Sequence, residues 1–106
     1  QLGGNETPGL WMAGNTLRLL ERAPNDLIHI DLAACQDYDA GLSHAEVVTC
    51  PTLFILGERD IMTPVRSAEK LISAVAKARV CVLEGSGHSL MMERPDALLD
   101  ALITIV

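Results

Sequence analysis

Two short apolar runs separated by a helical pattern constrain the fold of this chain more than any other feature. Residues 52–56 and 80–83 lack the polar alternation of a half-exposed strand, which is typical of parallel strands covered on both faces. Between them, from Val65 to Ala76, apolar residues recur at helical spacing. A strand, a crossover helix and a second strand form a parallel pair with a right-handed connection. The sequence therefore predicts an α/β unit, and a last amphipathic helix that opens at Glu93 completes a βαβα order.

The predicted sheet has an exposed edge, because two strands alone are only marginally stable. Both strands have the composition of buried strands, so the first needs a further neighbour. We expect the chain to lie beside several parallel strands that it does not contain. Its open edge should promote association with another copy or with the missing portion. The lack of an initial Met agrees with a chain that is part of something longer.

The N-terminal half has a helical pattern instead. Apolar residues within 10–22 fit a short helix, whose regular part we expect to begin at Thr16 because Asn15 is a suitable N-cap. A second helix follows residues 24–26 and is apolar on more than one side. Such a helix is normally sandwiched between other elements or covers a pocket.

Composition excludes several classes of protein. The 106 residues allow one domain, and 49% apolar residues are enough for a core. A net charge of −6 without a basic cluster argues against a nucleic-acid partner. Acids interrupt the apolar stretches well below bilayer-spanning length, so we expect no membrane segment, and the N-terminus is not a signal peptide. Cys35, Cys50 and Cys81 have no metal-site spacing and are interpreted as small buried residues of a reduced, cytoplasmic protein.

An acid and an imidazole follow the two predicted strands. Asp60 lies just past the first strand, and His88 lies just past the second, after Gly85-Ser86-Gly87. Because the carboxyl ends of parallel strands meet at one edge of a sheet, we expect these two side chains to lie together there. A carboxylate on one ring nitrogen fixes the tautomer of a histidine base. Asp60 and His88 are therefore the candidate catalytic residues.

Structural interpretations without a catalytic role compete with this one. Asp60 is equally suited to an Asx turn before Thr63-Pro64, which supply an N-cap and a helix-starting proline. Glu58-Arg59 is interpreted as a solvent-exposed stretch beside Asp60. His29 is interpreted as a core or surface residue, and His44 as a surface residue. No two histidines have metal-ligand spacing and no dinucleotide fingerprint is present, so we expect neither metal nor cofactor.

Asp then His, in that chain order, is the second half of a Ser…Asp…His triad. The first half, a nucleophile on a sharp strand-to-helix turn, is not among the 106 residues. The segment most similar to such a turn is Gly41-Leu42-Ser43-His44-Ala45. We reject it because its last position is not glycine and no buried strand precedes it. An acid and a base without a nucleophile give no acyl-enzyme chemistry, so we expect the chain alone to be inactive.

Four segments carry a resemblance to a known family: Cys50-Pro51-Thr52-Leu53-Phe54-Ile55-Leu56-Gly57-Glu58-Arg59-Asp60, Met62-Thr63-Pro64, Gly85-Ser86-Gly87-His88 and Glu93-Arg94-Pro95. Together they resemble the C-terminal third of the α/β-hydrolase superfamily. The resemblance implies that Asp60 is the triad acid, that His88 is the triad base, and that Glu93 and Pro95 start the closing helix. It divides the chain into a helical lid, residues 1–49, and a βαβα segment of an incomplete α/β-hydrolase core, residues 50–106. The lid part of the resemblance is looser.

The resemblance implies the C-terminal fragment of a serine-type hydrolase that cleaves ester, amide or related bonds of a small-molecule substrate. Haloperoxidase-like, dehalogenase-like and C–C-bond hydrolase reactions keep the same triad logic and stay open, because the nucleophile and the oxyanion loop are missing. A non-catalytic scaffold or interaction module is the alternative from another class. A strand followed by G-x-S-x-G upstream of the chain would favour the enzyme.

Overall fold

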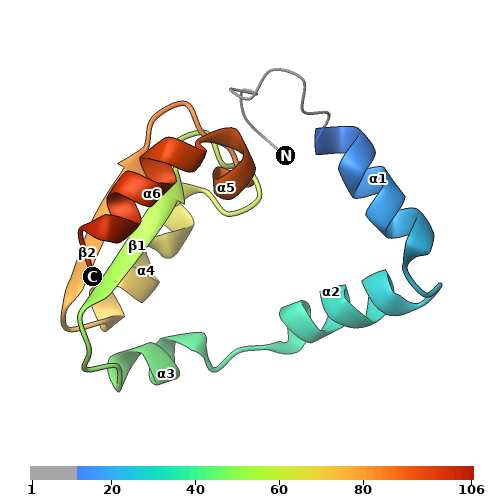
Figure 1. Ribbon diagram of the computed structural model, residues 1–106. Coiled ribbons are helices and arrows are strands. Elements are labelled where there is room, and N and C mark those ends of the chain that lie inside the picture. Colours follow the sequence, from blue (N-terminus) through green and yellow to red (C-terminus); the bar gives the residue numbers. More distant parts are fainter. Residues whose placement is uncertain (1–11) are drawn as a thin grey trace.

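The computed structural model describes residues 12–106, which form six helices and two strands (Figure 1). In chain order they are α1 (Met12–Arg22), α2 (Leu27–Asp37), α3 (Gly41–Glu46), β1 (Thr52–Gly57), α4 (Val65–Ala74), β2 (Ala78–Leu83), α5 (Leu90–Glu93) and α6 (Pro95–Ile103).

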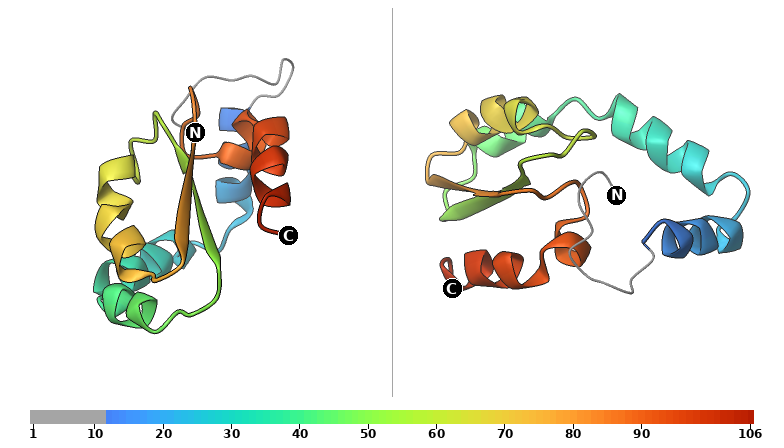
Figure 2. Two further views of the ribbon diagram at one scale, coloured as in Figure 1. Left: turned by 90° about the vertical axis from the view of Figure 1, so that its left-hand side faces the viewer. Right: turned by 90° about the horizontal axis from the view of Figure 1, so that it is seen from above.

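The two strands form the predicted parallel pair. β1 and β2 run in register from Thr52 opposite Ala78 to Gly57 opposite Leu83, and α4 makes the crossover between them. α4 covers one face of this sheet and α6 covers the other (Figure 2). The α/β class and the βαβα order are therefore confirmed. Both strands end at the same rim, which brings the loops that follow them together.

The strands are less buried than their composition predicts. Within residues 12–106, β1 pairs with β2 alone, and only the last residue of each strand, Gly57 and Leu83, is buried. Val80 and Val82 are 47% and 44% exposed. Within residues 12–106 the strands are therefore not buried on both faces, because α4 and α6 cover only part of a two-stranded sheet. That β1 lies beside further strands outside the chain stays a prediction.

The N-terminal helices also differ from expectation. α1 is already helical at Met12, and the Thr16 hydroxyl donates to the Met12 carbonyl over 3.1 Å, so Asn15 lies inside the helix and is not its N-cap. α2 buries no residue, and Ile30 and Leu32 are 59% and 64% exposed. α1 and α2 extend away from the sheet, whereas α3 packs against α4 (Figure 1). A sandwiched α2 is therefore not seen among the described residues.

Cysteine burial is a further correction. Cys35 and Cys50 are exposed, and Cys81 is half-buried. Cys35 belongs to α2, which buries no side chain, and Cys50 precedes β1 outside the small core, so neither can act as the buried apolar residue we expected. No helix found between Met12 and Val106 has the length and apolar character needed to cross a bilayer.

Candidate active site

The loops after β1 and β2 are joined by backbone hydrogen bonds at the rim of the sheet. The Glu58 N–H donates to the Leu83 carbonyl over 3.1 Å, and the Arg59 N–H donates to the Ser86 carbonyl over 2.8 Å. Gly57 allows this approach, because a Cβ atom there would lie 2.8 Å from the Ser86 oxygen and closer still to the Gly87 carbonyl oxygen. The glycine at the end of β1 is thus required by contact with the loop that carries the histidine.

Asp60 and His88 meet at this rim. His88 Nδ1 lies 3.0 Å from Asp60 Oδ2, with the Asp60 side chain 8% exposed and the His88 side chain 40% exposed. Asp60 also accepts the Thr63 N–H on Oδ1 over 2.9 Å and the Thr63 hydroxyl on Oδ2 over 2.8 Å. The structure thus brings together both residues that the sequence nominated.

The Asp60 carboxyl group is held in its ionised form. Burial raises its pKa, but the Thr63 backbone N–H, followed by His88 and the Thr63 hydroxyl, outweighs burial and lowers the pKa from 3.8 to about 2. An ionised carboxylate only accepts hydrogen bonds, so the proton of the shared bond belongs to His88 Nδ1. This tautomer, assigned from the hydrogen-bond partners, leaves Nε2 as a proton acceptor.

The two interpretations of Asp60 are compatible. The carboxylate closes a local turn through the Thr63 N–H, three residues on instead of the two of an Asx turn, and the same group binds His88. The prediction that Thr63 is an N-cap is wrong: Pro64 occupies that position, α4 begins at Val65, and no side chain caps the helix. Thr63 does not cap α4 because its backbone N–H and its hydroxyl both donate to the Asp60 carboxylate.

Carboxylates also hold the backbone of the histidine loop. Gly85, in the left-handed region with φ of +72°, donates its N–H to Glu58 Oε2 over 2.7 Å. The Gly87 N–H and the Ser89 N–H donate to the two oxygens of Glu93, each over 3.0 Å. Glu58 is exposed, as expected of a flank, yet it is bonded to the loop.

Glu93 is the part of the site that sequence reasoning placed differently. It ends α5 and is fully buried, whereas Pro95 begins α6. The resemblance assigned both residues to the start of the closing helix, which holds only for Pro95. An acidic residue five positions after His88, across one helical turn, was the available signal for a contact back to the loop.

The remaining candidates lie elsewhere. His29 is exposed, and His44 is bonded through Nδ1 to the Tyr38 hydroxyl over 2.9 Å. The rejected elbow is helix α3, in which the Ser43 hydroxyl donates to the Ala40 carbonyl. No cluster of three or more metal-ligating side chains occurs between residues 12 and 106.

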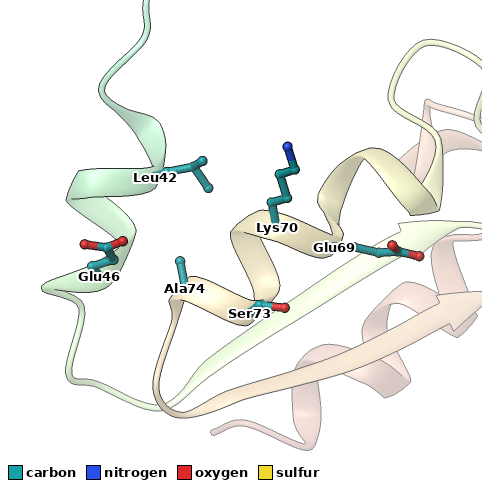
Figure 3. Close-up of a pocket in the computed structure, with 6 residues that line it drawn as sticks. All are labelled: Leu42, Glu46, Glu69, Lys70, Ser73 and Ala74. Carbon is teal, nitrogen blue, oxygen red and sulfur yellow. The ribbon is translucent and has the colours of Figure 1, made fainter.

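An open cavity of about 520 Å³ lies between α3 and α4 (Figure 3). Its lining is Leu42, Glu46, Glu69, Lys70, Ser73 and Ala74. Neither member of the acid–imidazole pair contributes to it, and its walls are helix surfaces rather than the sheet rim. The cavity is therefore separate from the candidate site at the rim.

A parallel strand pair with an acid after one strand and a bonded histidine after the next is the arrangement found in α/β-hydrolases. Residues 28–104 match the model of a family described as TAP-like protein. The chain belongs to the α/β-hydrolase superfamily.

Curated relatives agree with this assignment. RutD of Pseudomonas savastanoi pv. phaseolicola, which is named for carbamate hydrolysis, is 31% identical over 90 residues, or 77% of this chain and 34% of its own. The (R)-3-hydroxydecanoyl-ACP:CoA transacylase of Pseudomonas putida is 35% identical over 69 residues, or 65% and 23%. Monoacylglycerol lipase ABHD6 of Homo sapiens is 40% identical over 48 residues, or 45% and 14%. The chain spans about a third or less of these relatives.

Proposed function

We propose that the chain supplies the acid and the base of a serine-type triad to an α/β-hydrolase acting on ester, amide or related bonds. One observation carries the proposal: the 3.0 Å contact between Asp60 and His88 at the sheet rim of a member of this superfamily. Residues 1–49 would form a lid, and residues 50–106 would close the core.

In this mechanism His88 is the proton carrier. Nε2 removes the proton of the nucleophilic hydroxyl as its oxygen attacks the acyl carbon, and then gives that proton to the leaving group. Asp60 stays ionised, holds Nδ1–H and stabilises the imidazolium; its low pKa supports this role. In the second half of the reaction, His88 activates a water molecule in the same way. The water attacks the acyl-enzyme, which releases the free acid and regenerates the serine.

The nucleophile and the oxyanion donors belong to a part of the hydrolase outside these 106 residues. Two relatives carry names that refer to acyl transfer and to acylglycerol cleavage, and both reactions open an acyl–heteroatom bond. Among the bonds named above, we therefore favour an acyl ester or thioester. The cytoplasmic location and the self-association expected from the sequence stay predictions.

Turnover of p-nitrophenyl acetate tests the proposal in two steps. The 106-residue chain alone should release p-nitrophenol at the buffer rate, because it has no nucleophile. The full-length protein should turn the ester over, and Asp60→Asn should lower its kcat about 10⁴-fold, as in other triads, because the histidine loses its fixed tautomer.

His88→Ala should remove the turnover of the full-length protein, with His44→Ala as the matched control because His44 lies on α3 and contacts Tyr38 instead. Turnover by the isolated chain that depends on His88 would show that a nucleophile was missed. If Asp60→Asn left the kcat of the full-length protein unchanged, the Asp60 carboxylate would have no part in the mechanism.

A further inference from the structure

The geometry points to Glu93 as a positioning residue that sets the orientation of His88 by clamping the backbone on both sides of it. The inference deepens the proposed function and rests on it for its kinetic consequence. Its structural basis is independent, because it depends only on how the loop is held.

The clamp holds one peptide group on each side of the histidine. Oε1 of Glu93 accepts the N–H of Gly87, the residue before His88, and Oε2 accepts the N–H of Ser89, the residue after it. Both distances are 3.0 Å. These bonds hold the Ser86–Gly87 and the His88–Ser89 peptide groups. The short stretch between them, which carries the His88 Cα–Cβ bond, is left with little freedom, and Asp60 then determines the ring orientation.

The cost of burial indicates that the clamp does more than pack. Glu93 is fully buried, although few side chains among the described residues are buried to this degree. A carboxylate loses far more solvation on burial than an apolar side chain of similar volume, and it persists only where hydrogen bonds compensate. Here both compensating bonds go to the neighbours of one histidine, so the charge is placed where it defines that residue's backbone.

Glu58 offers a matched comparison. It binds the same loop, through the Gly85 N–H over 2.7 Å, but at a position three residues before His88 and from the other flank. Removing its charge also removes a carboxylate–amide bond from the loop. A general effect on loop order would appear in both variants, whereas an effect on histidine orientation should appear only for Glu93.

The test compares Glu93→Gln with Glu58→Gln in the full-length protein. Glutamine keeps one acceptor oxygen but turns an NH₂ group toward the second backbone N–H, so one half of the clamp becomes a donor–donor contact. The readouts are kcat and KM for p-nitrophenyl acetate, and the NMR signal of the His88 Nδ1–H proton bonded to Asp60. We expect Glu93→Gln to lower kcat about 10- to 100-fold, with KM within about twofold, and to weaken this signal. Glu58→Gln, which affects the loop three residues away from His88, should lower kcat by clearly less than Glu93→Gln and should leave the Nδ1–H signal in place.

Equal losses in the two variants, or a wild-type kcat and Nδ1–H signal in Glu93→Gln, would overturn the inference. If Glu93→Gln does not fold, Glu93→Asp keeps the charge but is too short to reach both amides. A folded Glu93→Asp with wild-type kcat and signal would overturn it equally. Should the wild-type protein show no turnover, the proposed function fails, while the Nδ1–H signal still reports whether Glu93 positions His88.

Discussion

Replacing Gly57 by Ala tests whether the close contact between the two rim loops determines the geometry of the acid–imidazole pair. Gly57 is not among the glycines with positive φ, so alanine meets no backbone strain there. The perturbation is purely steric, because the new Cβ atom would face the Ser86 and Gly87 carbonyl oxygens directly.

The size of the effect follows from these contacts. The added Cβ would lie 2.8 Å from the Ser86 oxygen and closer to that of Gly87, whereas ordinary contact begins at 3.4 Å. The loop must therefore retreat by more than half an ångström next to His88, enough to weaken the 3.0 Å bond to Asp60. Overpacking of this kind costs about 1–3 kcal/mol of stability, and misplacement of a reacting group by about 1 Å costs about 10²-fold in rate.

The assay is ester turnover by the full-length protein together with its thermal unfolding. Gly57→Ala should lower kcat by about 10- to 100-fold and lower the unfolding temperature. Gly41→Ala is the matched control, because its Cβ would lie 3.5 Å from the Tyr38 ring in ordinary contact and alanine favours the helix. A folded Gly57→Ala protein with wild-type kcat and the same Asp60–His88 contact would refute the reasoning.

Thr63 governs the ionisation of Asp60. Thr63→Val removes one hydrogen bond to the carboxylate and should raise its pKa from about 2 toward 3.8, which a carbon-13 NMR titration measures; Thr63→Ser should keep the low value. Because the folded pKa is depressed, the ionised carboxylate stabilises the protein above about pH 4, and this contribution is lost as the pH falls toward 2. In urea unfolding, Thr63→Val should therefore be less stable than Thr63→Ser at pH 7, and the difference should shrink at pH 2; a pH-independent difference would contradict this.

The features that could be predicted correctly from the sequence are those that depend on a local pattern or on the chain topology alone. β1 begins and ends within one residue of its apolar run, because strand composition and the flanking Pro51 and Gly57 are local signals. The meeting of Asp60 and His88 followed from chain direction, since any residue just past a parallel strand must reach the same rim.

The contacts of Thr63 and Glu93 could not be predicted in the same way. Threonine before proline is a common helix signal, and only the actual course of the loop shows that its hydroxyl turns back to Asp60. Glu93 reads as a surface acid near a helix boundary until the turn of α5 places it under the loop. The prediction for α2 is wrong for a different reason: its apolar pattern is typical of a helix covered on more than one side, but α2 buries none of its residues against the rest of residues 12–106.

The hydrogen bonds described above that hold the pair lie within residues 57–93, a short stretch of the chain. Three acids converge on the histidine loop: Glu58 and Glu93 bind its backbone amides, and Asp60 binds the ring. Backbone bonds fix a position, whereas a carboxylate on the ring favours the charged state that forms as the proton arrives. In the function proposed above, one set of charges holds the loop and another acts on the ring, so we expect a single buried glutamate to affect the rate without touching the reacting atoms.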